Sequence, residues 1–281
     1  MAKKNFYIRS ALFVPAANLD RIPKALATDA SIVIVDLEDA VEADVKFSVR
    51  QQLERWANDN PGRRFFLRIN DAKSPWFIDD LAFAGRIDKS ILGIMLPKAE
   101  SSKDVIPVER LGVPVIPLIE TAAGVTNLKD ICSVDGVTRL SFGELDMALD
   151  LGVDRNTKGA KRLINHIRSQ VCLHSRAAKL NPPLDTVYPN FKDSEGFKKQ
   201  LEFSKEMGFG GSLCIHPQQL EVVHEVFMPK PEDLEWAQRV VDAAQKYGNS
   251  VFQLDGEMID KPVIEHAYAV LKETDGVVIT R

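Results

Sequence analysis

Two acidic residues that each follow an apolar run are the strongest candidates for chemistry in this sequence. Glu120 ends the run Val113–Glu120, and Asp146 ends the segment Leu140–Asp146. Such runs are typical of buried strands, and the carboxyl ends of parallel strands form the edge at which ligands bind. Two carboxylates that meet there provide a site for a hard cation that keeps positions for water and substrate oxygens. The sequence therefore predicts that Glu120 and Asp146 hold Mg2+, with Mn2+ as the other possible ion.

Arg68 ends another strand-like segment and would add a fixed positive charge to these two acids. A divalent ion on substrate oxygens, together with a cation facing the developing negative charge, is what metal-assisted enolate chemistry needs. Each acid also has a purely structural interpretation. Glu120 can be an acid favoured near a helix N-terminus, and Asp146 can be an ordinary helix N-cap. Taken together with Arg68, the functional interpretation is the one we favour.

A tight acidic cluster, Asp36, Glu38 and Asp39, follows a further apolar strand. Three carboxylates facing one cavity would repel one another, so we expect an arginine to compensate part of their charge. Our preferred interpretation is that one of these acids holds Arg68 or orients a metal-bound water, as supporting carboxylates do in metal sites. Direct metal ligation by the cluster is the alternative.

Basic residues near the N-terminus form a second candidate group. Arg9 lies in the first predicted strand, and Arg21 and Lys24 lie in the first predicted helix. They are either solvated charges or partners for the phosphate groups of a substrate, with which guanidinium and ammonium groups pair well. His216, before Pro217, is better explained as a structural hydrogen-bonding residue than as an acid or a ligand.

Eight short apolar runs alternate with amphipathic segments, which is the pattern of a parallel sheet with helical crossovers. We therefore predict an α/β fold, a TIM (β/α)8 barrel over residues 1–228. A C-terminal helical extension over 229–281 is expected to pack over the barrel mouth or a neighbouring subunit. The predicted strands are Tyr7–Val14, Ser31–Val35, Phe65–Ile69, Ile91–Leu96, Val113–Ile119, Val137–Phe142, Thr186–Tyr188 and Leu213–Ile215, and the extension has a run at Ser250–Leu254 and a last helix at Val263–Thr274.

Composition narrows the class of protein. The chain has 281 residues, of which 45% are hydrophobic, so one large core is expected rather than disorder. The net charge of −4 argues against nucleic acid or an anionic membrane as a partner. No run approaches the ~20 apolar residues of a membrane span. The three cysteines show no CxxC spacing and follow no secretory signal, so a cytoplasmic location is expected.

Six motifs, in order along nearly the whole chain, resemble those of the HpcH/HpaI aldolase and citrate lyase superfamily. The similarity is to the citrate lyase β-subunit-like branch, which includes malyl-CoA, methylmalyl-CoA and citramalyl-CoA lyases. The motifs are Arg9–Pro15, Asp36–Val41, Arg68–Asn70, Ile119–Gly124, Phe142–Asp146 with Asp150–Gly152, and Ile215–Gln218.

The resemblance implies a TIM barrel that assembles as a homotrimer or homohexamer, with magnesium at Glu120 and Asp146. It implies further that Arg68 binds the keto-acid oxygen and steadies the enolate, and that Arg9 and nearby basic residues such as Lys24 meet the phosphates of CoA. Asp260 matches an aspartate of a Gly-x-Met-Ile-Asp segment that enters a neighbouring active site in the CoA lyases.

The function implied is a Mg2+-dependent carbon-carbon lyase. It would cleave a 3-hydroxyacyl thioester of the citramalyl-CoA or malyl-CoA type into an acetyl-type thioester and a 2-oxo acid. One alternative is a citrate lyase β subunit that acts on citryl groups carried by an acyl-carrier protein. Another is a non-catalytic homologue that binds acyl-CoA without turnover.

Overall fold

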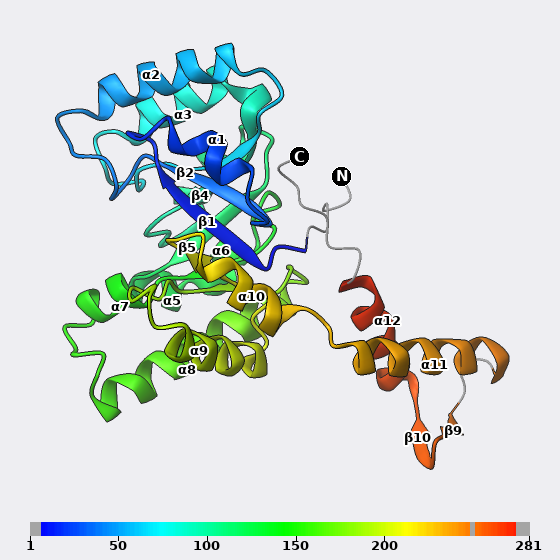
Figure 1. Ribbon diagram of the computed structural model, residues 1–281. Helices are drawn as coiled ribbons and strands as arrows, with labels where there is room; N and C mark the ends of the chain where they lie inside the picture. The colour runs from blue at the N-terminus through cyan, green and yellow to red at the C-terminus, as the bar shows by residue number, and fades with distance from the viewer. Residues whose placement is uncertain (1–6, 248–250, 274–281) are drawn as a thin grey trace. The chain divides into compact units, whose positions relative to one another are not determined.

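The computed structural model describes residues 7–247 and 251–273, which form two compact units that divide between Val226 and Phe227. The first unit is a closed barrel of eight parallel strands in sequential order, and pairing of β1 with β8 closes it (Figure 1). The predicted fold class is therefore confirmed. The strands are β1 Ser10–Pro15, β2 Ile32–Asp36, β3 Phe65–Arg68, β4 Ile91–Leu96, β5 Val115–Ile119, β6 Ser141–Phe142, β7 Leu184–Asp185 and β8 Gly211–Cys214.

β4 matches its predicted range, the other strands are shifted or shortened at their ends, and β6 and β7 differ most. β7 lies at Leu184–Asp185, directly before the predicted segment 186–188, and β6 is confined to two residues of the predicted 137–142. The apolar pattern extends beyond the residues that pair, because Val137 makes only an isolated bridge to Val115. Thr186 instead follows β7 and lines the cavity described below.

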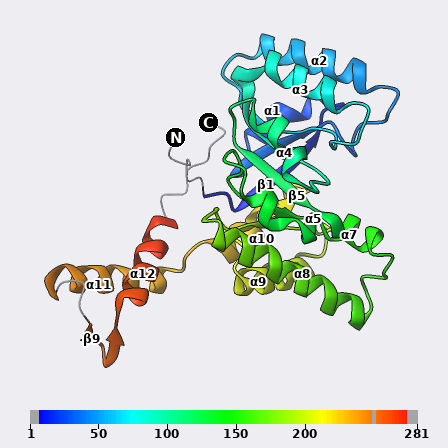
Figure 2. The same cartoon turned by 180° about the vertical axis from the view of Figure 1, so that it is seen from behind.

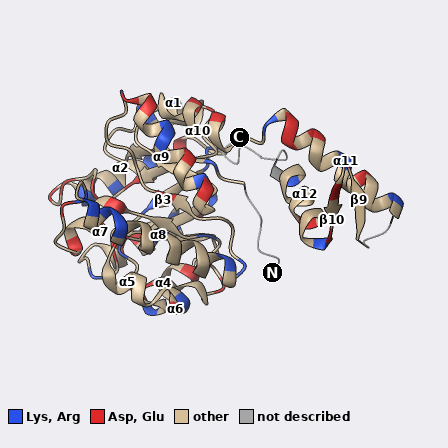
Figure 3. Cartoon of the chain, turned by 90° about the horizontal axis from the view of Figure 1, so that it is seen from below, with Lys and Arg blue, Asp and Glu red and all other residues tan. Residues whose placement is uncertain are grey.

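Helices cover the outside of the barrel (Figures 1 and 2). Their bounds are α1 Arg21–Leu26, α2 Lys46–Asp59, α3 Phe77–Arg86, the 3-10 turn η1 Asp88–Ser90, α4 Ser102–Glu109, α5 Ala122–Thr126, α6 Leu128–Cys132, α7 Glu144–Asp150, α8 Lys158–Ala177, α9 Ser194–Met207 and α10 Gln219–Phe227. Lys and Arg are interspersed with Asp and Glu on these helices (Figure 3), in keeping with the small net charge.

Local sequence explains why these elements form. All five residues of β2, Ile-Val-Ile-Val-Asp, are buried, as expected of β-branched residues in a strand covered on both faces. In α8 the buried residues Ile164, Ile167 and Val171 recur at helical spacing and form its inner face. The helix begins after Thr157, whose side chain accepts the backbone N–H of Ala160.

The second unit consists of α11 Pro231–Tyr247, β9 Phe252–Leu254, β10 Glu257–Ile259 and α12 Lys261–Glu273. Its core contains Val240 of α11 and Ile264 of α12, both buried. The hairpin turn Asp255–Gly256 has positive φ at both residues, which is the geometry that an Asp-Gly pair favours. Ser250 and Thr274, which bounded the predicted run and last helix, lie outside the described residues. No helix in the described part of the chain is long and apolar enough to cross a membrane.

Candidate active site

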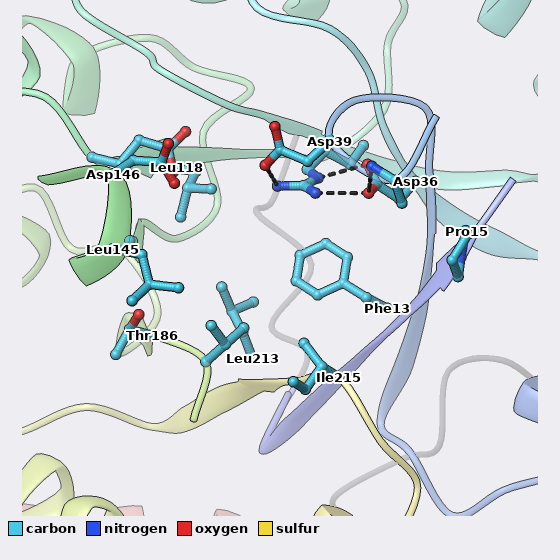
Figure 4. A pocket seen from close by; sticks show the side chains of 15 residues that line it. Phe13, Pro15, Asp36, Asp39, Leu118, Leu145, Asp146, Thr186, Leu213 and Ile215 are labelled. Atoms are coloured by element: carbon cyan, nitrogen blue, oxygen red, sulfur yellow. Dashed lines mark hydrogen bonds and ion pairs between the residues drawn. The ribbon is translucent and has the colours of Figure 1, made fainter. Parts of the chain in front are cut away.

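A cavity of about 350 Å3 lies at the carboxyl ends of the barrel strands (Figure 4). Its walls combine a polar side, which carries acids from several strand ends, with an apolar side. In Figure 4, Asp146 and Leu145 lie across the cavity from Asp36 and Asp39. The lining residues are Phe13, Pro15, Asp36, Asp39, Ala40, Arg68, Leu118, Glu120, Gly143, Leu145, Asp146, Thr186, Val187, Leu213 and Ile215.

Arg68 is fixed by a two-pronged hydrogen bond to Asp36. Its Nε and Nη2 each donate to one oxygen of the Asp36 carboxylate, both at 2.7 Å. Asp36 ends β2 and pairs in register with Arg68 at the end of β3, so the sheet itself brings the two side chains together. The guanidinium also lies 4.7 Å from the centre of the Phe13 ring, within cation–π distance. Arg68 is therefore held rigidly at the cavity wall. This confirms the prediction that one acid of the cluster holds it.

The other two members of the cluster also face Arg68. Its Nη1 lies 2.9 Å from Glu38 Oε2 and 3.5 Å from Asp39 Oδ2. Burial, with a smaller contribution from Asp39, raises the pKa of Glu38 to about 7 against the opposing effects of Arg68 and Lys98. Burial by itself would lower the pKa of Arg68, but its acidic partners, Asp36 first, outweigh this and raise the pKa. Arg68 thus stays positively charged.

Glu120 is almost fully buried at the end of β5, with 2% of its surface exposed. Its Oε1 accepts the backbone N–H of Lys98 at 2.8 Å. A Cβ placed on Gly143 would lie only 2.6 Å from Glu120 Oε2, so the glycine makes room for the carboxylate. Burial raises the pKa of Glu120 to about 8, with Glu38 and Asp146 as further causes. The carboxylate is therefore short of compensating positive charge.

Asp146 lies in the first turn of α7, not at its N-cap, which is Gly143. The N-cap interpretation of Asp146 is therefore wrong, since the chain turns into the helix three residues earlier. Its side chain is about one-third exposed and lies 4.0 Å from Lys98 Nζ. Asp146 and Glu120 reach the cavity from consecutive strand ends, as the sequence predicted.

Lys98 is a residue of this site to which sequence reasoning gave no role. It follows β4 with a left-handed φ of 47°, a conformation that costs energy for a residue with a side chain. Its backbone N–H binds Glu120, and its ammonium group forms an ion pair with Glu38. Burial would lower the pKa of Lys98, but the ion pair with Glu38 outweighs it and raises the pKa. Its position directly after a strand was the signal that could have identified it.

Four predicted site residues do not line the cavity. One of them, Glu38, still contacts the lining residue Arg68. Arg9 directly precedes β1, at the end of the strands opposite to Pro15, so this placement gives no support to its assignment as a substrate-binding residue. Lys24 is exposed in α1 and pairs with Asp20 at 3.1 Å. Asp260 belongs to the second unit, where its Oδ1 accepts the backbone N–H of Val263 at the start of α12.

His216 has the structural surroundings expected of it. Its ring stacks on Phe191 with 4.3 Å between centroids. Its Nδ1 accepts the backbone N–H of Gln218, while its own backbone N–H donates to the Gln219 side chain. These contacts order the turn that follows β8, next to the cavity residue Ile215.

The charge of the cavity suits a hard cation. Among the described residues that line it, four are acids, namely Asp36, Asp39, Glu120 and Asp146, and one, Arg68, is a cation. Arg68 is already paired with Asp36, which leaves Glu120 and Asp146 facing the cavity with Lys98 as their nearby cation. Carboxylate oxygens are the ligands that Mg2+ prefers, and two of them leave positions for water and substrate. No group of three or more His, Cys, Asp or Glu in the described ranges is arranged to hold a metal.

Comparison of the chain with known proteins finds a matching family model and several similar proteins. The family model HpcH/HpaI aldolase/citrate lyase matches residues 9–217. A citrate lyase subunit beta-like protein of Deinococcus radiodurans is 33% identical over 94% of this chain and 96% of its own length. A (3S)-malyl-CoA thioesterase of Cereibacter sphaeroides is 33% identical over 99% of this chain and 98% of its own.

A similar solved structure is that of CitE from Mycobacterium tuberculosis in complex with magnesium, acetoacetate and coenzyme A. It is 31% identical, has a TM-score of 0.79, and the match covers 96% of this chain and 98% of that one.

Proposed function

The chain belongs to the HpcH/HpaI aldolase/citrate lyase family, and from this premise we propose that it is a Mg2+-dependent carbon-carbon lyase. Its substrate is a 3-hydroxyacyl thioester of the citramalyl-CoA or malyl-CoA type, and its products are a 2-oxo acid and an acetyl-type thioester. The observation that carries the proposal is the acidic cavity in which Arg68 is held beside Glu120 and Asp146. The complex of the CitE relative with magnesium, acetoacetate and coenzyme A supports the ligand class.

Glu120 and Asp146 are the residues that would hold the metal. The fit is supported by the Glu120 carboxylate, whose pKa is raised first by burial and then by Glu38 and Asp146, so that a cation beside it would stabilise its ionised form. When bound, the ion supplies Lewis acidity to the hydroxyl and carboxylate oxygens of the part of the substrate that becomes the 2-oxo acid.

Arg68 supplies a fixed positive charge in the reaction. In cleavage, the hydroxyl proton passes to solvent water, the hydroxyl carbon becomes a carbonyl, and the electron pair of the broken carbon-carbon bond remains as an enolate on the thioester fragment. A charged donor that is already held in place stabilises such an enolate without reorganisation. Asp36 provides that rigidity, because its carboxylate occupies two of the donors and fixes the guanidinium plane. Glu38 and Asp39 assist Arg68 in this role.

Asp260 is proposed as the acid that protonates the enolate carbon, with its second unit reaching the active site of a neighbouring subunit. Its resemblance to the tail aspartate of CoA lyases supports this role. The role requires a homo-oligomer, which we propose to be a homotrimer or homohexamer. In the condensation direction the same carboxylate would remove the proton.

The acyl group of the substrate is attached to a carrier through its thioester. We propose CoA, with Lys24 among the cations that meet its phosphates, and we place the protein in the cytoplasm. An acyl-carrier protein is the alternative carrier, as in a citrate lyase complex. The apolar wall formed by Phe13, Leu118 and Leu213 would accommodate the substituent that distinguishes one substrate from another.

Thioester hydrolysis is a second candidate function, favoured by one observation. A relative that is 33% identical over nearly the whole chain is named a (3S)-malyl-CoA thioesterase. The same cavity would then bind the same class of thioester, but water would attack the carbonyl and release free thiol.

A substrate panel tests the proposal. The purified protein is incubated with malyl-CoA, methylmalyl-CoA, citramalyl-CoA and citryl-CoA, and with citryl-carrier protein, in Mg2+ and in EDTA, while 2-oxo-acid release is followed by a coupled assay. We expect Mg2+-dependent release from one or more CoA thioesters. Release from the carrier-protein substrate alone would identify the alternative carrier. Silence across the panel would contradict the lyase proposal, and a thiol assay of the same samples would then separate thioester hydrolysis from a binding role.

A further inference from the structure

A second cavity, of about 640 Å3, lies on the barrel unit between α8, α9 and the loops that follow α7 and β7. Helices α7, α8 and α9 are neighbours on one side of the barrel (Figures 1 and 2). Its lining residues differ from those of the first cavity, and the two sets have no residue in common. The lining comprises Glu144, Arg155, Asn156, Lys161, Ile164, Asn165, Arg168, Tyr188, Pro189, Asn190, Lys199, Gln200 and Phe203.

The charge of this second cavity is the reverse of the first. Among its described lining residues there are four cations and one acid, Glu144. The positive charge of the buried Arg168 is compensated, because its guanidinium donates hydrogen bonds to Asp185 at 3.1 Å and to Glu144 at 2.7 Å. Arg155 has a looser contact with the same Glu144, at 3.5 Å. Lys161 adds a further ammonium group, and Lys199 adds one that lies 3.9 Å from the Glu195 carboxylate. The four cations of the wall therefore exceed by one the three carboxylates that pair with them, those of Glu144, Asp185 and Glu195.

A buried hydrogen-bond donor lies in the same wall. The Nε2 atom of Gln200 is shielded from solvent and makes no hydrogen bond within the described structure. Such a donor costs free energy unless an acceptor satisfies it. This donor is shielded from the cavity as well as from solvent, so the cations are the groups of the wall that an anionic ligand would meet.

We propose that this second cavity binds a phosphate-bearing small molecule. Several cations on the wall of one cavity suit a multiply charged group with several acceptor oxygens, and a phosphate or pyrophosphate is such a group. The proposal does not depend on the lyase reaction. The bound phosphate belongs either to a free ligand or to the nucleotide part of a thioester cofactor.

The site adjoins the first cavity through shared segments. Gly143, Leu145 and Asp146 line the first cavity, while Glu144 between them lines the second. The backbone N–H of Glu144 donates to Thr186 Oγ1, at 3.0 Å, on the wall of the first cavity. A phosphate in the second cavity would therefore lie behind the segment that carries Asp146.

Calorimetric titration with pyrophosphate in EDTA tests the proposal without metal or turnover. The wild-type protein should bind, and Lys161→Gln should weaken binding by roughly tenfold, the effect of one lost charge-assisted hydrogen bond. Lys158→Gln is the matched control, since Lys158 lies on the same helix but does not line the cavity. It should leave the affinity unchanged.

The outcomes separate the possible sources of the phosphate. Displacement of pyrophosphate by CoA would assign the cavity to the cofactor's nucleotide phosphates, and binding that CoA leaves intact would assign it to a separate ligand. Absence of pyrophosphate binding, or binding that Lys158→Gln weakens as much as Lys161→Gln does, would overturn the proposal. Far-UV circular dichroism and a cooperative urea transition like that of the wild type would show that Lys161→Gln is folded.

Discussion

Arg68 and Asp36 share two parallel hydrogen bonds of 2.7 Å, one from Nε and one from Nη2, at the ends of two adjacent barrel strands. Asp36 also accepts the backbone N–H of Glu38 at 2.9 Å. One carboxylate therefore fixes both the guanidinium and the loop that carries the other acids. The orientation of Arg68 toward the cavity depends on Asp36.

Asp36→Asn should impair turnover through Arg68. The amide keeps the shape of the carboxylate but loses its charge and offers only one acceptor to the guanidinium. We expect kcat/KM to fall by about 10²-fold, the scale of one lost preorganised donor. Stability should also fall by about 3 kcal/mol, because a buried ion pair loses one partner. Steady-state kinetics and urea unfolding measure the two effects.

Asp39→Asn provides the matched control for this variant. The Asp39 carboxylate is 3.5 Å from Arg68 and its side chain is 61% exposed, so its ion pair is weak. We expect less than about 1 kcal/mol loss of stability and a smaller kinetic effect. Equal losses in the two variants would contradict the positioning role of Asp36.

The stability of the metal-free protein should depend on pH through Glu120. Its pKa is raised from 4.5 to about 8 in the folded chain, so the folded state binds more protons than the unfolded state between these values. Stability from this group is present below about pH 4.5 and is lost as pH rises toward 8. Glu120→Gln, which carries no charge, should be more stable than wild type, by a margin that grows from pH 5 to pH 8.

Urea unfolding in EDTA at pH 5, 6.5 and 8 measures this margin. The difference in the free energy of unfolding between variant and wild type cancels the contributions of other titrating groups, including Glu38, whose pKa is also raised. Mg2+ should stabilise the wild type at pH 8 and should have little effect on the variant. A margin that does not change with pH would refute the raised pKa.

Gly143→Ala should weaken metal binding. The added Cβ would lie 2.6 Å from Glu120 Oε2 and 2.9 Å from its Cβ, so the carboxylate must move. We expect Mg2+ affinity to fall by at least about tenfold, as for other changes that disturb ligand orientation. Gly159→Ala in α8 is the control, because its Cβ would meet nothing within 4 Å. Calorimetric titration with Mg2+ compares the two, and equal affinities would count against Glu120 as a ligand.

Asp260→Ala should lose turnover without losing Mg2+ binding. Loss of a positioned acid typically lowers the rate by about 10²–10⁴-fold. If Asp260 acts in a neighbour's active site, mixing this variant with Arg68→Lys, each nearly inactive alone, should restore activity. Mixed oligomers would contain some sites with both residues intact. Activity that stays at the sum of the two variants after subunit exchange would place the residue within its own subunit's site or outside catalysis.

The sequence predicted those parts of the site that depend on strand order and strand ends. Glu120, Asp146 and Arg68 follow apolar runs, and parallel closure of the barrel necessarily brings such positions to one rim. Lys98 has the same kind of position, but its role depends on a left-handed backbone that turns its N–H toward Glu120. No periodicity in the sequence indicates that conformation.

Other features could not be predicted because they depend on which residues become buried together. The raised pKa of Glu120 arises from burial beside Glu38 and Asp146, which are distant in sequence. The identification of Asp36 as the main partner of Arg68, among three nearby acids, required the register between β2 and β3. Arg9 shows the reverse case. Its charge suggested a ligand contact, but the direction of β1 places it at the opposite end of the barrel from Pro15.

The most direct test of the central claim is to measure both possible products of one turnover. A 3-hydroxyacyl-CoA substrate is incubated with wild-type protein in Mg2+, in EDTA, and with Asp146→Asn in Mg2+, and 2-oxo acid, acyl thioester and free thiol are each quantified by mass spectrometry. We predict equal amounts of 2-oxo acid and acyl thioester, without free thiol, only for wild type in Mg2+. Free thiol with the intact hydroxy acid, or cleavage that persists in EDTA, would contradict a metal-dependent carbon-carbon lyase.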